Sequence, residues 1–574
     1  MAEGDLSSAQ GYYEKSLAID EELLERTGTI EVKRELSLCY KSLGDVAKEM
    51  GNITMARRYY EKSLILREEL LGKTGTIESR RDLAISYETL GDTALSMGII
   101  PLARNYYGVS MALTEELVKM TETIEPRRDL SICYDRLGYI EKEMGDLASA
   151  QSYYGKSLII RLELAEKTGT IESKSDLSLS YRDLGNIAME MGDLPLALVY
   201  YKKRLAITEE LVEKTGTNES KRELEISYFI LGDIAKEMGN LYLAQSYYEK
   251  SRIITEELTK KSEAVELIRD LSIIYERLGD IAKEKGDLSS ARACYEKSLV
   301  IAEELAEKTG TIDSKRDLWA SYISLGDTAM AEGDLLSARG YYEKCLAIAE
   351  ELIEMTGSYV SRMDLSVSYS RLGNIAKEKG DLSAAQSYYE KSLAINKELA
   401  EKTETNRSKR NLLVVYIKLG DILKEKGDLS SARGYYEKAL PIAEELADKT
   451  GTSESMETLW TINNSLGATA FGMEDYLSAQ GFYEKSVNIF ELLIKEMGTI
   501  QVYSDYLYAL FMLGICFYNN SIKKRFGLFK YIDKQLSERA KTTLERVVEI
   551  GMASSDDYLS ELGKKARDIL DNYF

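Results

Sequence analysis

Histidine is absent from this sequence of 574 residues. Its absence excludes Ser-His-Asp and Cys-His nucleophile activation and every imidazole metal ligand within the chain. The five cysteines are widely spaced and form no Cys-x-x-Cys pair: Cys39, Cys133, Cys294, Cys345 and Cys516. We therefore expect them to be packing residues, and we predict no catalytic residue, no metal site and no cofactor.

Proline is also scarce, with 4 residues, and no apolar run reaches the length of a membrane span. No signal peptide is visible at the start. These absences predict a cytoplasmic, reduced protein without a membrane span.

Acidic residues outnumber basic ones. The chain has 75 Lys and Arg and 96 Asp and Glu, which gives a formal net charge of −21. Nucleic acid requires a basic surface and is disfavoured as a partner. The acids are spread along the chain, which is typical of a solvated helical surface.

The chain contains a sequence repeat that recurs many times. A glycine, here called the repeat glycine, recurs every 47 residues: Gly44, Gly91, Gly138, Gly185, Gly232, Gly279, Gly326, Gly373, Gly420, Gly467 and Gly514. An alanine follows twelve residues later in the units from Ala56 to Ala479. The register does not slip, so the chain is predicted to be an array of similar units.

Capping residues divide each unit into two helices. A threonine opens the first helix, as at Thr311, and equivalents are Thr29, Thr76, Thr123, Thr170, Thr217, Thr405, Thr452 and Thr499. A glycine closes the second helix: Gly28, Gly75, Gly169, Gly216, Gly310, Gly357, Gly451 and Gly498. Glu122, Glu263 and Glu404 replace that glycine, and we expect looser turns there.

The spacing of Tyr369, Leu372, Gly373 and Ala376, followed by Ala385, Tyr389 and Leu393, resembles the tetratricopeptide repeat. The resemblance implies an all-α fold, an α-solenoid in which antiparallel helix pairs form a right-handed superhelix. The usual family period is 34 residues, so these units of 47 are extended and similar to kinesin-light-chain-like repeats.

The array predicts four segments. They are an N-terminal half repeat over 1–28, ten helix pairs over 29–498, a degenerate eleventh repeat with a basic aromatic insert over 499–551, and a capping helix over 552–574. The insert, Lys523 to Tyr531, is either an end-cap loop or a binding loop for an acidic partner. The half repeat lacks its first helix, so we expect either a natural protein that extends upstream of Met1 or an uncapped end used for docking or self-association.

Two positions in each first helix, three before and one after the repeat glycine, are here called the groove positions. The resemblance implies that first helices line the concave face, and these positions lie one turn apart on it. Family members that hold a C-terminal carboxylate use Lys or Arg with Asn at these places, and here only Arg182 with Asn186 matches. The residues predicted to bind a partner are Asp135, Tyr139, Arg182, Asn186, Phe229, Asp233, Glu276, Asp280, Ile323 and Asp327.

The predicted fold and groove residues indicate a function in binding. The sequence predicts an acidic, non-catalytic scaffold for protein–protein interaction, whose concave face binds a protein or peptide that is basic or mixed in charge. An alternative is the sensor or regulatory arm of a larger signalling or defence assembly whose effector domain lies elsewhere. A peptide-pheromone receptor is a third reading.

Overall fold

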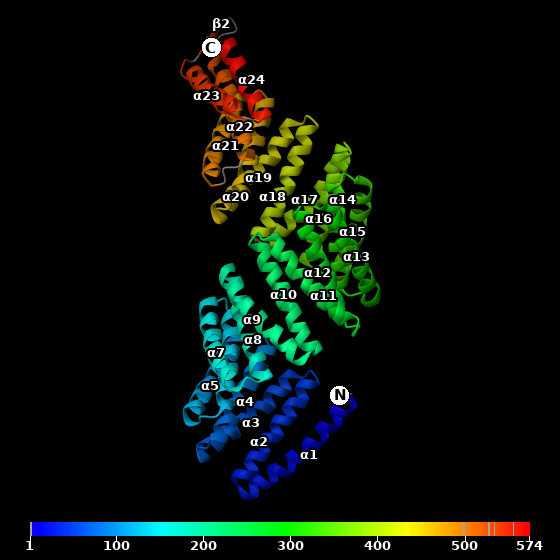
Figure 1. Ribbon diagram of the computed structural model, residues 1–574, viewed down its shortest axis with the longest axis vertical. Coiled ribbons are helices and arrows are strands. Elements are labelled where there is room, and N and C mark those ends of the chain that lie inside the picture. The colour runs from blue at the N-terminus through cyan, green and yellow to red at the C-terminus, as the bar shows by residue number, and fades with distance from the viewer. Residues whose placement is uncertain are drawn as a thin grey trace. The chain divides into compact units, whose positions relative to one another are not determined.

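The computed structural model describes residues 3–403, 405–496, 500–525, 529–532, 534–554 and 556–573, and side chains are described except for 3–5, 494–496, 500–503, 522–525 and 529–532. Within these residues the fold is all-α apart from one short hairpin (Figure 1). Two compact units make up the chain, Met1–Cys294 and Tyr295–Phe574.

Helices of two kinds alternate, and each packs against the next in sequence through most of the chain. The first helices of the units are α2 (Ile30–Glu49), α4 (Ile77–Ser96), α6 (Ile124–Glu143), α8 (Ile171–Glu190), α10 (Asn218–Glu237), α12 (Val265–Glu284), α14 (Ile312–Ala331), α16 (Tyr359–Glu378), α18 (Asn406–Glu425), α20 (Ser453–Gly472) and α22 (Ile500–Ser521). The second helices are α1 (Glu3–Thr27), α3 (Ile53–Thr74), α5 (Ile100–Met120), α7 (Leu147–Thr168), α9 (Leu194–Thr215), α11 (Leu241–Thr259), α13 (Leu288–Thr309), α15 (Leu335–Thr356), α17 (Leu382–Thr403), α19 (Leu429–Thr450) and α21 (Tyr476–Glu496). This stack of helix pairs is the α-solenoid that the sequence predicts.

Helix caps lie where the sequence places them, with one exception. Thr311 accepts a hydrogen bond from the backbone N–H of Ser314 at 3.2 Å, and the closing Gly357 has a left-handed φ of 57°. Thr123 makes no such bond, because the third residue after it is Pro126, which has no N–H to donate. The exception therefore concerns the side-chain bond alone, because Thr123 still stands at the N-cap of α6 as the sequence predicts.

Two of the turns that lack the closing glycine can be inspected. The second helix α5, before Glu122, ends at Met120, and α11, before Glu263, ends at Thr259, three residues short of the place where its neighbours end. These two helices end early where the left-handed residue is missing, whereas α17, before Glu404, runs to Thr403, as far as its neighbours. Glu404, Gly498 and Thr499 lie outside the described residues.

The repeat glycine sits against a tyrosine ring. A Cβ atom added to Gly232 would lie 2.6 Å from the ring of Tyr248, and the same is true within a few tenths of an ångström in other units. Ala244, twelve residues after the glycine, is fully buried beside that ring. The two small residues therefore let the helices of one pair approach closely, as the sequence predicts.

The paired glutamates on the second helices have separate structural partners. In α11, Glu256 accepts a hydrogen bond from the hydroxyl of Tyr275 in the next unit at 2.7 Å. Glu257 accepts one from Lys221, in the first helix of its own unit, at 2.6 Å. These bonds give the recurrent pair a structural role in each unit.

Further pairs join successive first helices. Arg81 of α4 lies 3.1 Å from Asp129 of α6, and Arg128 of α6 lies 2.9 Å from Asp176 of α8. Each unit thus contacts its neighbours through polar as well as apolar groups, as expected of an array stabilised between nearest neighbours.

Beyond α22 the chain forms a hairpin of β1 (Ile522–Arg525) and β2 (Phe529–Ile532), then α23 (Lys534–Ala553) and α24 (Asp557–Tyr573). The strands are antiparallel, with Lys523 opposite Tyr531. Residues 526–528 of the predicted insert, and the side chains of both strands, lie outside the described residues. No helix in the described parts of the chain is long and apolar enough to cross a membrane.

The glycine–tyrosine contact predicts opposite effects for one substitution at two sites. Gly232→Ala forces a methyl group into the ring of Tyr248 and is expected to cost about 1–3 kcal/mol. Gly155→Ala, inside α7, meets no atom within 4 Å and is expected to stabilise by about 0.5–1 kcal/mol through helix propensity. Thermal unfolding and hydrogen exchange of the full chain measure both, and equal effects would contradict the contact.

Candidate functional site

The acids one residue after the repeat glycine, here called the ladder acids, are hydrogen-bonded inside the fold. Asp233 accepts from the hydroxyl of Tyr248 at 2.6 Å, and Asn186 accepts from that of Tyr201 at 2.5 Å. The same bond recurs from Tyr60 to Asp45 at 2.8 Å. These side chains thus hold the buried tyrosine of their own unit and are only partly available to a ligand.

Cations from the following unit neutralise several ladder acids. They stand two residues before the repeat glycine: Arg371 lies 2.9 Å from Asp327, and Arg277 lies 3.4 Å from Asp233. Asp280 is paired differently, with Lys236 of the preceding unit at 3.1 Å. The series of acids is therefore less negative than its sequence indicates.

The ladder is interrupted at Tyr139 of α6. The other units up to that of Gly420 have Asp or Asn at this position, and the last two have Ala468 and Ile515. The side chain of Tyr139 is 42% exposed. The buried Tyr154 of α7 consequently has no acid to receive its proton, and its hydroxyl has no hydrogen-bond partner among the described residues, although the residue is only 5% exposed. Burial raises the pKa of Tyr154, so the hydroxyl remains a donor.

A cavity of about 270 Å³ opens at this place, between α6 and α8 with α7 as its floor. Its lining brings together three of the predicted groove residues, Asp135, Tyr139 and Arg182. The rest of the lining is Ile132, Arg136, Tyr154, Arg161, Leu179 and Asp183.

The two carboxylate oxygens of Asp135 have different surroundings. One accepts a short hydrogen bond from Arg161, which also donates to the backbone oxygen of Asp176 at 2.9 Å. The other oxygen, Oδ1, is buried without a hydrogen bond of good geometry, although the buried hydroxyl of Ser157 lies close enough to lower the pKa of Asp135. Burial raises the pKa of Asp135 to about 6, against the opposing effect of Arg161.

Two further arginines border the cavity. Arg182 donates from Nε to its neighbour Asp183 at 2.9 Å and is 38% exposed, and Arg136 lies 3.6 Å from Asp92. With Arg161 they give three guanidinium groups near two carboxylates in the lining. The cavity thus offers donors from arginine and tyrosine, one free acceptor on Asp135 and an exposed aromatic ring.

The remaining predicted residues do not line this cavity. The ring of Phe229 packs 5.7 Å from that of Tyr248, Glu276 is half-buried on α12, and Ile323 packs against the apolar cluster that contains Tyr342. Asn186, Asp233, Asp280 and Asp327 are the ladder residues described above, and Asp327 also accepts from Tyr342 at 2.6 Å. Ile323 and Asp327 belong to the unit Tyr295–Phe574, and the other predicted residues to Met1–Cys294.

Sequence reasoning missed the floor of the cavity. Arg161 occupies a position of the second helix that is Arg67 and Thr114 in the two preceding units and Thr208 and Thr255 in the next two. Because Arg67 is also buried there, an arginine at this position alone was no signal. The unit of Gly138 differs in combining that arginine with Tyr139 in place of a ladder acid.

Comparisons with known proteins agree with the fold. A family model described as tetratricopeptide repeat matches residues 37–96 and 364–445, and a second of the same description matches 226–251, 273–304 and 320–352. No match is found among curated protein sequences.

Solved structures are similar at low identity. BtubC (BKLC) from P. vanneervenii is 17% identical, with 44% of this chain and 92% of that chain covered and a TM-score of 0.36. The apo form of RapI is 13% identical, with 72% and 99% covered and a TM-score of 0.45. A STAND protein with a tetratricopeptide repeat sensor, PH0952 from Pyrococcus horikoshii, is 13% identical, with 86% and 74% covered and a TM-score of 0.43. At these values the likenesses do not bear on function.

The buried pair of Asp135 and Arg161 predicts a pH-dependent loss of stability. Arg161→Met leaves a carboxylate without its cation in a site where that cation is 6% exposed, and is expected to cost about 3–5 kcal/mol at pH 7.5. The folded-state pKa of Asp135, about 6, lies above that of an unfolded aspartate, so proton uptake favours the folded state as the pH falls below 6. The loss should therefore shrink at pH 5.

Hydrogen exchange of the α6, α7 and α8 amides measures this loss locally. The matched control is Arg339→Met, which removes an ion pair to Glu343 whose arginine is 54% exposed, and which is expected to leave exchange unchanged at both pH values. A loss for Arg161→Met that did not vary between pH 7.5 and pH 5 would contradict the role given to Asp135.

Proposed function

We propose that this chain, a member of the tetratricopeptide-repeat family, is a non-catalytic scaffold that binds a peptide segment of a partner protein at the cavity between α6 and α8. Repeats of this family commonly serve protein–protein interaction, which supports a binding role in general. The observation that carries the specific site is Oδ1 of Asp135, which is buried without a hydrogen bond, in a cavity that Tyr154 also lines.

Unpaired buried polar groups are costly, and a ligand that pairs them recovers that cost. A backbone C=O from the ligand can accept from Tyr154, and a backbone N–H can donate to Asp135. An extended peptide presents both groups, and the exposed ring of Tyr139 offers an apolar surface for one of its side chains.

The charge of the lining indicates a partner of mixed charge. Arg136 and Arg182 are each paired with an acid but are 43% and 38% exposed, so a partner carboxylate can approach either. Because Tyr248 and Arg277 already engage Asp233, the acids of the next unit contribute less attraction for a strongly basic peptide than the sequence alone suggests.

The test is selection of peptides from a random library against the full chain, followed by affinity measurement. The double variant Tyr139→Ala with Arg182→Gln is expected to lower the affinity of selected peptides at least tenfold. Neither side chain is buried, so the fold should survive, which circular dichroism checks.

A matched control is available on the second helices. Tyr242 of α11 is 77% exposed, away from the groove positions, and Tyr242→Ala should leave the affinity unchanged. Selected peptides that bind the double variant as well as the parent would move the binding site away from this cavity.

A further inference from the structure

A second cavity lies in the other unit, between α16 and α18 with α17 as its floor. Its volume is about 170 Å³. For comparison, an engineered cavity of about 150 Å³ in another protein holds a benzene molecule. The space therefore suits a small molecule or one side chain, and it is independent of the site proposed above.

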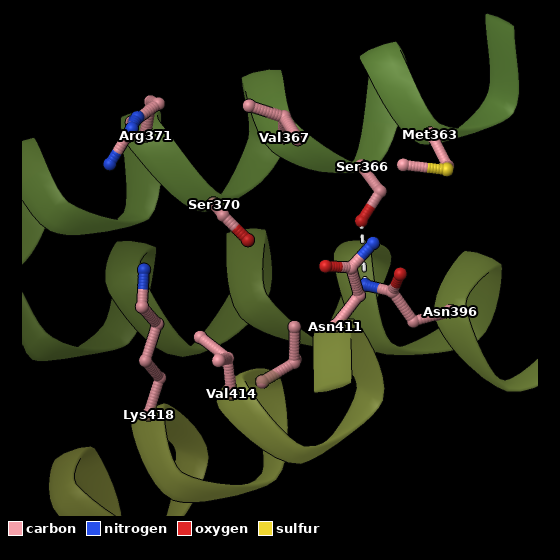
Figure 2. Close-up of a pocket in the computed structure, with 10 residues that line it drawn as sticks. Met363, Ser366, Val367, Ser370, Arg371, Asn396, Asn411, Val414 and Lys418 are labelled. Carbon is pink, nitrogen blue, oxygen red and sulfur yellow. Dashed lines mark hydrogen bonds between the residues drawn. The ribbon is translucent and has the colours of Figure 1, made fainter. Parts of the chain in front are cut away.

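Figure 2 shows that the lining has three parts in sequence along the cavity. Arg371 and Lys418 face one another across one end, Val367 and Val414 lie in the middle, and Ser366, Asn396 and Asn411 are at the other end. The cavity is thus cationic, then aliphatic, then amide-lined.

The cationic end has an excess of positive charge. Arg371 shares Asp327 with the hydroxyl of Tyr342, while its own Nε is buried and has no partner. Lys418 donates to the side-chain oxygen of Asn374 at 2.9 Å, a neutral acceptor. Two cations are therefore matched by one acid.

Burial of Lys418 is only partly compensated, by the hydrogen bond to Asn374 and by the ring of Tyr389, whose centroid lies 5.4 Å from the ammonium nitrogen. Desolvation, with Arg371 nearby, lowers the pKa of Lys418 to about 8. The nearest cation on α16 after Arg371 is Lys377, which is itself paired with Glu425 at 2.9 Å. An anion that entered between Arg371 and Lys418 would supply the missing charge.

The amide end has unused hydrogen-bonding groups. Asn396 is 3% exposed and donates to Ser366 at 2.7 Å, but its side-chain oxygen accepts nothing from the described residues. The side-chain amide of Asn411 likewise makes no hydrogen bond with a described residue. A polar group of a ligand can pair with both.

The spacing of the two ends sets the ligand length. Ser366 and Arg371 are five residues apart on α16, roughly 7.5 Å at about 1.5 Å per residue, which a chain of about six carbon atoms spans. Val367 and Val414 provide the apolar wall that such a chain would cover.

We propose that this cavity binds a short aliphatic carboxylate, held with its carboxylate between Arg371 and Lys418, its chain along Val367 and Val414, and a hydrogen-bonding group at its far end beside Asn396 and Asn411. The cations stand two residues before the repeat glycines and not at the groove positions, where this region has Ser370, Asn374, Ile417 and Asp421. The carboxylate can belong to a free acid or to an acidic side chain of a polypeptide, and the experiment separates these sources.

The probe is 6-hydroxyhexanoate, titrated calorimetrically into the full chain. Saturable binding is expected, with 1,6-hexanediol, which lacks the carboxylate, at least tenfold weaker. Lys418→Met, which keeps the apolar stem but removes the charge, should also weaken binding at least tenfold. Lys438→Met, an exposed lysine on α19, is the matched control and should not.

A second variant tests the proposal independently, in case Lys418→Met does not fold. Val414 is 41% exposed, so Val414→Asp can place a competing carboxylate at the cavity without disturbing the core, and it too should weaken binding at least tenfold. The double variant Tyr139→Ala with Arg182→Gln should bind the probe normally, which keeps this outcome separate from that of the peptide site.

A peptide with blocked termini and one central glutamate distinguishes the sources. If it competes with 6-hydroxyhexanoate, the cavity accepts an acidic side chain; if only the free acid binds, the ligand is a small molecule. Absence of binding by both, or equal binding of the acid and the diol, overturns the proposal. Undiminished binding by folded Lys418→Met and Val414→Asp overturns it as well.

Discussion

The ring of a buried tyrosine occupies the place that a Cβ atom on the repeat glycine would need, and much of the structure depends on this contact. Because the ring fills the space beside one helix backbone, the two helices of a pair are held at a fixed, short separation. The same contact directs the tyrosine hydroxyl toward the residue after the glycine. One steric requirement thus sets the pair geometry and also determines which groove residue receives a hydrogen bond.

The hydrogen bond from the tyrosine hydroxyl to the ladder acid also fixes how that acid contacts the next unit. An acid such as Asp327 is held by its own tyrosine in a position that Arg371 of the following first helix can reach. The face built from groove positions is therefore a chain of donor and acceptor pairs with few free charges. At Tyr139, where this series of pairs is interrupted, a cavity opens in which a carboxylate oxygen of Asp135 is buried without a hydrogen bond.

The helices, their caps and the small residues could be predicted from the sequence, because each depends on local periodicity repeated in register. Three of the predicted groove residues, Asp135, Tyr139 and Arg182, were also predicted to face one region, and they line one cavity. The floor of that cavity could not be predicted, since Arg161 belongs to a different helix and its approach to Asp135 depends on packing across 26 residues. The neutralisation of Asp233 and Asp327 was missed for the same reason: their partners are an arginine 44 residues away and a tyrosine 15 residues away.

The fixed offsets of these bonds have a consequence for how such a chain can change in length. Bonds between units fall 44 and 48 residues apart, and bonds within a unit or from one helix to the next fall 36 and 19 residues apart. Insertion of one residue inside a helix would displace the partners on one side of every such bond that spans it. Exchange between two copies of the gene, aligned one repeat out of register, adds or removes a whole unit and preserves all four offsets. Whole-unit duplication and deletion are therefore the length changes that this architecture tolerates.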